Sequence, residues 1–161
     1  MPALSDFDIT ETAVAPLKEG ELLLNAKYIS VDPYMRGRMS DAKSYVQPFE
    51  VGRPLNGGVI AEVAESHNPE FMPGDIVLGH LQWQEKQGGR AEQGKKLDKN
   101  EAPLSLYLGM LGMPGLTAYF GLLDIGKPVA GETVVVSGAA GAVGIVVCQI
   151  ARIKGCKVVG I

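Results

Sequence analysis

Apolar and polar positions follow two different patterns along the chain. In the first hundred residues the apolar side chains come in short alternating or continuous runs, which are typical of β-strands. Strands are expected over residues 7–14, 21–31, 58–64, 75–79 and 80–83. Turn residues at Pro73-Gly74-Asp75 and at Gly88-Gly89 are expected to break these runs, and short strands with such breaks predict a small β-barrel.

From Ala102 onward the apolar residues take helical spacing. Helices are predicted over 104–111 and 116–123, with Met113-Pro114-Gly115 as a breaker between them. The remaining pattern predicts a short buried strand over 132–136, a helix over 142–154 and a second strand from Lys157. This order is one βαβ unit.

A glycine- and alanine-rich segment, Ser137 to Gly144, connects the expected strand to the expected helix. In such a position a pyrophosphate can meet backbone N–H groups and the positive end of a helix. Gly138 is expected to form the turn, Gly141 to let the phosphates approach the backbone, and Gly144 to let the helix pack closely on the strand. The spacing is G-x-x-G-x-x-G rather than G-x-G-x-x-G, so a merely structural turn stays open as an alternative.

Charge and composition narrow the kind of partner. The formal net charge of −3, with scattered basic residues, predicts no binding to nucleic acid or to an anionic membrane surface, and favours a small-molecule partner. No secretory signal or membrane span is expected, and Cys148 and Cys156 lie too far apart along one helix and its exit to bridge. A cytoplasmic location is therefore predicted.

Three separated motifs carry a family resemblance. Residues 31–39 read Val-Asp-Pro-Tyr-Met-Arg-Gly-Arg-Met, residues 112–119 read Gly-Met-Pro-Gly-Leu-Thr-Ala-Tyr, and the glycine-rich segment follows. In this order the chain resembles the prostaglandin and curcumin reductase branch of the medium-chain dehydrogenases and reductases. The resemblance implies a GroES-like β-barrel catalytic domain over 1–112, then a hinge helix and the start of an incomplete Rossmann NADP-binding domain over 113–161. The active site would lie between the two.

The catalytic zinc ligands of related dehydrogenases are missing. Those relatives place a cysteine after the second strand and Gly-His-Glu before the next one, whereas this chain has Asp32-Pro33 and Leu55-Asn56-Gly57. A catalytic zinc needs three protein ligands. The resemblance is therefore to the zinc-independent branch, and no metal site is expected.

The resemblance also implies a cofactor site for NADP(H). The glycine-rich segment would lie along the pyrophosphate, and the backbone around residues 113–117 would approach the nicotinamide. The expected cofactor-binding residues are Pro114, Thr117, Gly138, Gly141, Ala142, Val143 and Gly144. For the Pro-Gly segment, a simple connector between helices is the alternative.

Two tyrosines are the candidates for the substrate side. Tyr34 and Tyr45 flank the segment that forms the cleft wall in the family, and a phenol offers a flat apolar surface and a hydrogen-bond donor. Both are expected to contact substrate, and Tyr34 is the expected catalytic donor. Barrel packing is the alternative for both. Arg36 and Arg38 are expected to make structural pairs with carboxylates or carbonyls.

The function that these features imply is NADPH-dependent reduction of the carbon–carbon double bond of an α,β-unsaturated carbonyl compound. Quinone reduction, the activity of a neighbouring zinc-free branch, is one alternative. A non-catalytic fragment or binding module is another. A homodimer is expected for the full-length protein.

Overall fold

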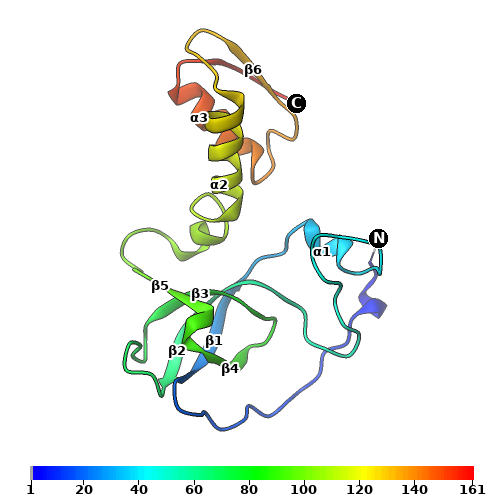
Figure 1. Cartoon of the computed structure of the whole chain (residues 1–161), viewed down its shortest axis with the longest axis vertical. Helices are drawn as coiled ribbons and strands as arrows, with labels where there is room; N and C mark the ends of the chain where they lie inside the picture. The colour runs from blue at the N-terminus through cyan, green and yellow to red at the C-terminus, as the bar shows by residue number, and fades with distance from the viewer. Residues whose placement is uncertain (1) are drawn as a thin grey trace.

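An antiparallel sheet of five strands forms the N-terminal lobe of the protein. The structure, a computed structural model, describes residues 2–161. The strands are β1 (Glu21–Ile29), β2 (Asn56–Ser66), β3 (Ile76–Gln82), β4 (Lys86–Arg90) and β5 (Gly94–Leu97), in the order β4-β1-β2-β3-β5. A short helix, α1 (Tyr34–Gly37), lies beside this sheet in the connection from β1 to β2 (Figure 1).

The sheet curls into a barrel-like shape because its two outer strands follow each other in the chain. Only a 3₁₀ turn, η2 (Ala91–Gln93), joins β4 to β5, although these strands are at opposite ends of the strand order. The sheet must therefore bend until its edges approach each other. Ala91 is buried at this point, within the same apolar core as Leu22 and Val77. The predicted small barrel is confirmed in this partly open form.

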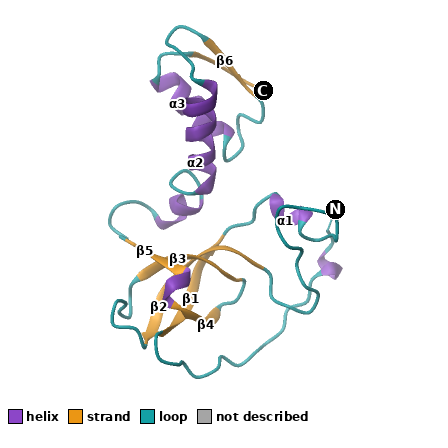
Figure 2. Cartoon of the chain, in the orientation of Figure 1, coloured by secondary structure: helices purple, strands orange, loops and turns teal. Residues whose placement is uncertain are grey.

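A second lobe carries the helices and a parallel strand pair (Figure 2). It contains η3 (Leu104–Leu108), α2 (Met113–Phe120), η4 (Gly121–Gly126), β6 (Thr133–Val136), α3 (Gly144–Ile153) and β7 (Lys157–Gly160). Strands β6 and β7 pair in parallel, and α3 crosses between them. Ala151 on α3 packs with Leu122 and Cys156 in the core of this lobe. The predicted βαβ unit is confirmed.

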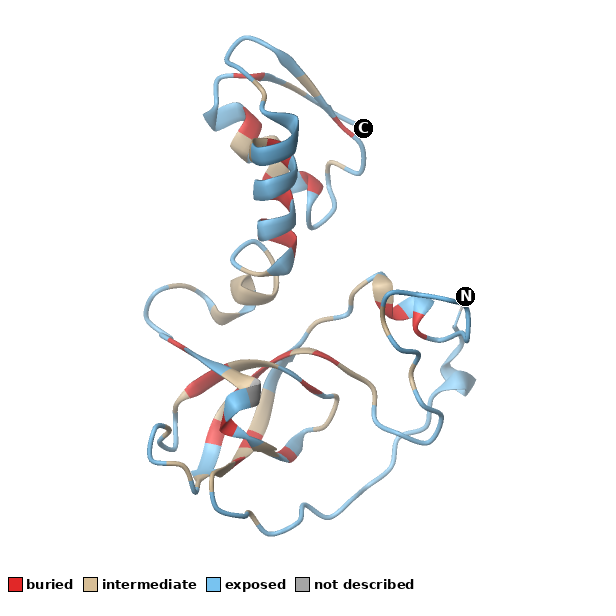
Figure 3. Ribbon diagram, viewed as in Figure 1, coloured by how far each residue is buried: buried red, intermediate tan, exposed pale blue. Residues whose placement is uncertain are grey.

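Much of the second lobe remains in contact with solvent (Figure 3). Val135 on β6 is 60% exposed, Ile145 on α3 is 49% exposed, and Phe120 on α2 is 51% exposed. Parallel strands are normally covered by helices on both faces. Here α3 covers only part of the small sheet. None of the described helices is long and apolar enough to cross a membrane.

Some of the sequence predictions for the first lobe were wrong. Residues 7–14 form no strand, and Ile9 is 97% exposed, because no neighbouring strand pairs with this segment. The two strands expected over 75–79 and 80–83 are one strand, β3. Gly88 and Gly89, expected as a break, lie inside β4, where they pair with Leu23 and Leu22.

The helical segments also differ from expectation. The helix expected over 104–111 is only the short 3₁₀ turn η3, which ends at Leu108. Met113-Pro114-Gly115 is not a breaker but the first turn of α2. Proline is tolerated there because the first N–H groups of a helix have no partner within the helix.

Candidate functional site

The turn between β6 and α3 has the close backbone packing that its glycines predict. Gly138 has a φ of +61°, in the left-handed region that favours glycine. A Cβ atom on Gly144 would lie 2.2 Å from the carbonyl oxygen of Gly138. Only glycine fits at this position without a shift of the backbone. Gly138 therefore forms the turn as predicted, whereas Gly144 packs against the turn at Gly138 and Ala139 rather than against the strand.

The start of α3 presents backbone N–H groups with no protein partner. Within residues 2–161, no backbone or side-chain acceptor receives a hydrogen bond from the N–H of Ala142, Val143 or Gly144. The helical hydrogen bonds begin with the Ile145 N–H, which donates to the Gly141 carbonyl at 3.0 Å. Free N–H groups and the positive helix end together favour an anion.

Gly141 lies in the exposed part of this turn. Its N–H donates to the Gly138 carbonyl at 2.9 Å, and a Cβ at this position would lie 3.1 Å from the same oxygen. A small side chain would thus be tight but not impossible within the turn itself. The absence of a side chain also leaves the outer side of the backbone open to an approaching ligand.

The predicted residues Pro114 and Thr117 lie on α2, in the same lobe as the glycine turn. Pro114 is buried, and the exposed Thr117 donates its hydroxyl hydrogen to the Met113 carbonyl at 2.8 Å. Gly115 follows Pro114 because a Cβ there would lie 1.8 Å from the Met110 carbonyl oxygen. Since α2 packs on α3, these residues and the glycine turn share one lobe.

Tyr34 and Tyr45 lie near each other on the first lobe. Tyr34 is half-buried at the start of α1, and Met35 beside it is buried and fixes this helix on the sheet. Burial and the nearby Asp32 raise the pKa of the Tyr34 hydroxyl, Arg38 opposes them, and Tyr45 adds to the increase. Tyr45 itself is 88% exposed, so its ring is free for a contact.

These two groups of residues lie on different lobes of the described chain. Helix α1 makes no extensive contact with α2 or α3, and it lies apart from them in Figure 1. The structure therefore brings the tyrosines together on one lobe, and the glycine turn, Pro114 and Thr117 together on the other.

Arg38, which was not among the predicted site residues, ends the short helix that begins with Tyr34. Arg38 is only 7% exposed and donates to the carbonyl of Gln47 at 2.9 Å and to Oδ1 of Asn56 at 2.7 Å. The expectation of pairing with carbonyls is confirmed for Arg38, but its burial was not foreseen. Its spacing of four from Tyr34 on a helical turn was the available indication.

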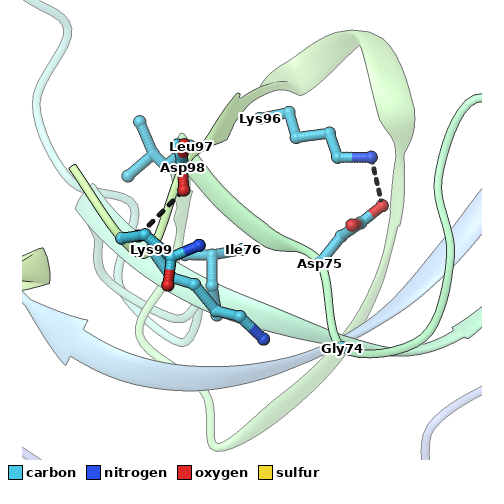
Figure 4. Close-up of a pocket in the computed structure, with 8 residues that line it drawn as sticks. Gly74, Asp75, Ile76, Lys96, Leu97, Asp98 and Lys99 are labelled. Atoms are coloured by element: carbon cyan, nitrogen blue, oxygen red, sulfur yellow. Dashed lines mark hydrogen bonds and ion pairs between the residues drawn. The ribbon is translucent and has the colours of Figure 1, made fainter.

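Other features of the surface carry no candidate chemistry. In the described part of the chain, no group of three or more His, Cys, Asp or Glu residues could hold a metal. A shallow pocket of about 330 Å³ lies between residues 74–76 and 96–100 (Figure 4). Its walls are tied by the Lys96 Nζ and Asp75 Oδ2 atoms, 2.6 Å apart. None of the predicted site residues lines this pocket.

Several known proteins are similar to this chain in sequence. Residues 1–97 match a family model described as the N-terminal domain of oxidoreductase. The protein YfmJ of Bacillus subtilis is 58% identical over 161 residues, which are 100% of this chain and 47% of its own length. The NADPH-dependent curcumin reductase of Escherichia coli is 48% identical, over 99% of this chain and 46% of its own length.

Solved structures of two NADPH-bound oxidoreductases are also similar to this chain. CurA from Vibrio vulnificus, in complex with NADPH, is 45% identical with a TM-score of 0.91 over 99% of this chain and 47% of that chain. The quinone oxidoreductase of Escherichia coli, also with NADPH, has a TM-score of 0.62 at 23% identity over 94% of this chain and 47% of that chain, a likeness of fold alone. The chain spans about half the length of the curated relatives that it matches.

Proposed function

Because the chain belongs to the zinc-independent medium-chain dehydrogenases and reductases, we propose that it supplies the substrate wall and the pyrophosphate turn of an NADPH-dependent reductase. The reaction is reduction of the carbon–carbon double bond of an α,β-unsaturated carbonyl compound. The observation that carries this proposal is the turn from Gly138 to Gly144, with its free N–H groups, in a chain that is 48% identical to a curcumin reductase.

The proposed cofactor is NADP(H), and the residues present fit it. The free N–H groups of Ala142, Val143 and Gly144 suit a pyrophosphate, and the missing side chain at Gly141 leaves room for its approach. The exposed Thr117 and the rigid turn at Pro114 are proposed to line the nicotinamide side. When bound, this cofactor supplies the hydride for the β-carbon of the substrate.

The proposed roles of the tyrosines are donation and orientation. As hydride reaches the β-carbon of an enone, negative charge develops on the carbonyl oxygen. The Tyr34 O–H is proposed to donate a hydrogen bond to this oxygen, because a phenol is protonated at neutral pH. The exposed ring of Tyr45 is proposed to cover the flat conjugated part of the substrate.

The domain boundary, the oligomeric state, the location and the kind of partner are also proposals. The boundary between the catalytic and the nucleotide-binding domain is proposed between residues 112 and 113, at the start of α2. A homodimer, a cytoplasmic location and a small-molecule partner rather than nucleic acid or a membrane remain predictions. Quinone reduction has weaker support, because the solved quinone oxidoreductase shares only the fold.

A chimera tests the proposed function. In it, residues 1–161 replace the matching segment of the Escherichia coli curcumin reductase, and the unaltered enzyme is the positive control. We expect NADPH-dependent loss of enone absorbance, with slower reaction from NADH and with quinones. The 161-residue chain alone should bind NADPH weakly and show no turnover, because only one βαβ unit is present. A folded chimera that binds NADPH but reduces no enone would support the alternative of a non-catalytic module.

A further inference from the structure

Arg38 is the only buried charged side chain among the residues that the structure describes. A buried guanidinium is costly unless its donors are satisfied and its charge is balanced. No carboxylate of the described chain lies within ion-pair distance of Arg38. The Arg38 guanidinium therefore donates hydrogen bonds to neutral groups, and no carboxylate forms an ion pair that would neutralise its positive charge.

The loop that carries Tyr45 is fastened by Arg38. The Nε atom of Arg38 donates to the Gln47 carbonyl at 2.9 Å, and its guanidinium carbon lies 4.0 Å from the centre of the Phe49 ring. The Phe49 N–H donates in turn to the Arg38 carbonyl at 2.7 Å. Since Tyr45 lies just before these two attachment points, Arg38 limits the positions that its ring can take.

The same guanidinium is anchored on the sheet through Asn56. Nη1 of Arg38 donates to Oδ1 of Asn56, the first residue of β2, at 2.7 Å. His80 on β3 lies with its Nε2 atom 3.0 Å from the same oxygen. Because Arg38 donates from a fixed planar group, this contact to the sheet defines its direction.

Tyr34 lies on the same helical turn as Arg38, whose N–H donates to the Tyr34 carbonyl. Tyr34 precedes Arg38 by four residues, a spacing that brings two side chains of a helical turn together. The positive charge of Arg38 lowers the pKa of the Tyr34 hydroxyl, against the larger raising effects of burial and of Asp32. The other ionisable groups that face this hydroxyl are Asp32 and Tyr45.

We propose that Arg38 is a positioning residue of the substrate wall, which fastens the Tyr45 loop beside Tyr34 and places a positive charge, paired with no carboxylate, on the same helical turn as Tyr34. This inference rests on the proposed function, in which Tyr34 donates to the carbonyl oxygen of the substrate. Arg38 itself acts through the two tyrosines and through its field. A purely structural Arg38 would fasten the loop and leave the acidity of Tyr34 unchanged.

Tyrosine titration by NMR separates these roles in the 161-residue chain. With ring-carbon-labelled tyrosine, and Tyr34→Phe to assign the signal, the Tyr34 titration midpoint should move upward in Arg38→Gln, because a nearby positive charge is lost. Arg38→Lys should restore part of the change. Arg36→Gln is the matched control. Arg36 is exposed, and this substitution removes the same positive charge two residues away from Arg38. Equal midpoints in Arg38→Gln and the unaltered chain would overturn the proposal.

A second variant serves if Arg38→Gln does not fold, as judged by circular dichroism. Asn56→Ala leaves the guanidinium in place but removes its anchor on β2. It should move the Tyr34 midpoint in the same direction by a smaller amount. No movement in a folded Asn56→Ala protein would count against the anchoring step.

Steady-state kinetics in the curcumin reductase chimera supply the functional readout. Arg38→Gln should lower kcat about tenfold or more, with a smaller change in KM, because misplaced donors act mainly on the transition state. Arg36→Gln should leave both constants near their starting values. Equal losses in the two variants would overturn the proposal. An unsubstituted chimera without activity would contradict the proposed function instead, while the titration would still decide whether Arg38 controls Tyr34.

Discussion

The α-carbon of Gly144 packs against the carbonyl group of Gly138, so closely that an added Cβ would lie 2.2 Å from its oxygen. Gly144→Ala should therefore lower the free energy of unfolding by about 2 kcal/mol, because the backbone of the turn must move. Chemical denaturation followed by circular dichroism measures this loss. Gly121→Ala is the matched control: Gly121 is helical, exposed and has no neighbour within 4 Å of such a Cβ. It should be neutral or stabilising by about 0.5 kcal/mol. Equal effects in the two variants would contradict the close contact.

Gly141→Val should weaken NADPH binding more than it weakens folding. The branched side chain would project from the turn where the pyrophosphate is proposed to approach, while the turn lies in an exposed part of the lobe. Calorimetric titration of the chimera with NADPH, compared with its thermal melt, separates the two effects. Ala140→Val, at an exposed neighbouring position of the turn, is the control for β-branching alone. If Gly141→Val lost stability and binding in the same proportion, the turn would be merely structural.

Asp75 should make stability depend on pH in the acid range. Burial raises the pKa of its carboxyl, but hydrogen bonds from Lys96 and from the Met72 N–H outweigh this and hold it below its ordinary value of 3.8. A depressed pKa in the folded state stabilises the fold above the unfolded value, and this contribution disappears as the pH falls through the folded value. Asp75→Asn should therefore be less stable than the unaltered chain at pH 7.

The difference between the two proteins should narrow as the pH falls below 3.8. Denaturation midpoints measured across the acid range test this. Glu62→Gln is a suitable control, because Glu62 pairs with Lys27 on the surface, with 38% of its side chain exposed, and water screens such a pair. It should show a smaller change at every pH. A constant difference between Asp75→Asn and the unaltered chain would contradict the assignment.

The protein should bind no zinc in stoichiometric amount. The regions in which zinc-dependent relatives place their ligands hold Asp32-Pro33 and Asn56-Gly57, and the Asn56 oxygen is used by Arg38. Elemental analysis after purification without chelators measures the metal directly. One zinc per chain, lost on chelation together with enone reduction in the chimera, would contradict the assignment to the zinc-independent branch.

The sequence by itself determined the order of the two lobes and the chemistry of the turn. The glycine-rich segment between a β-branched strand and a helix has one good solution, because Gly138 and Gly144 are required where backbone meets backbone. Such local constraints are written in neighbouring residues and can be predicted from them. The roles of Gly141, Pro114, Thr117 and the two tyrosines follow from the resemblance to the reductase family, and they remain predictions.

Only the tertiary structure decided what depends on distant partners. Residues 7–14 alternate like a strand but have no neighbour to pair with, whereas Gly88 and Gly89 look like a break yet form a strand because β1 lies beside them. Arg38 is the clearest case. Its burial depends on Asn56, eighteen positions along the chain, which β2 brings to its guanidinium. A sequence pattern records spacing along the chain, while burial and hydrogen bonding depend on which segments the fold brings together.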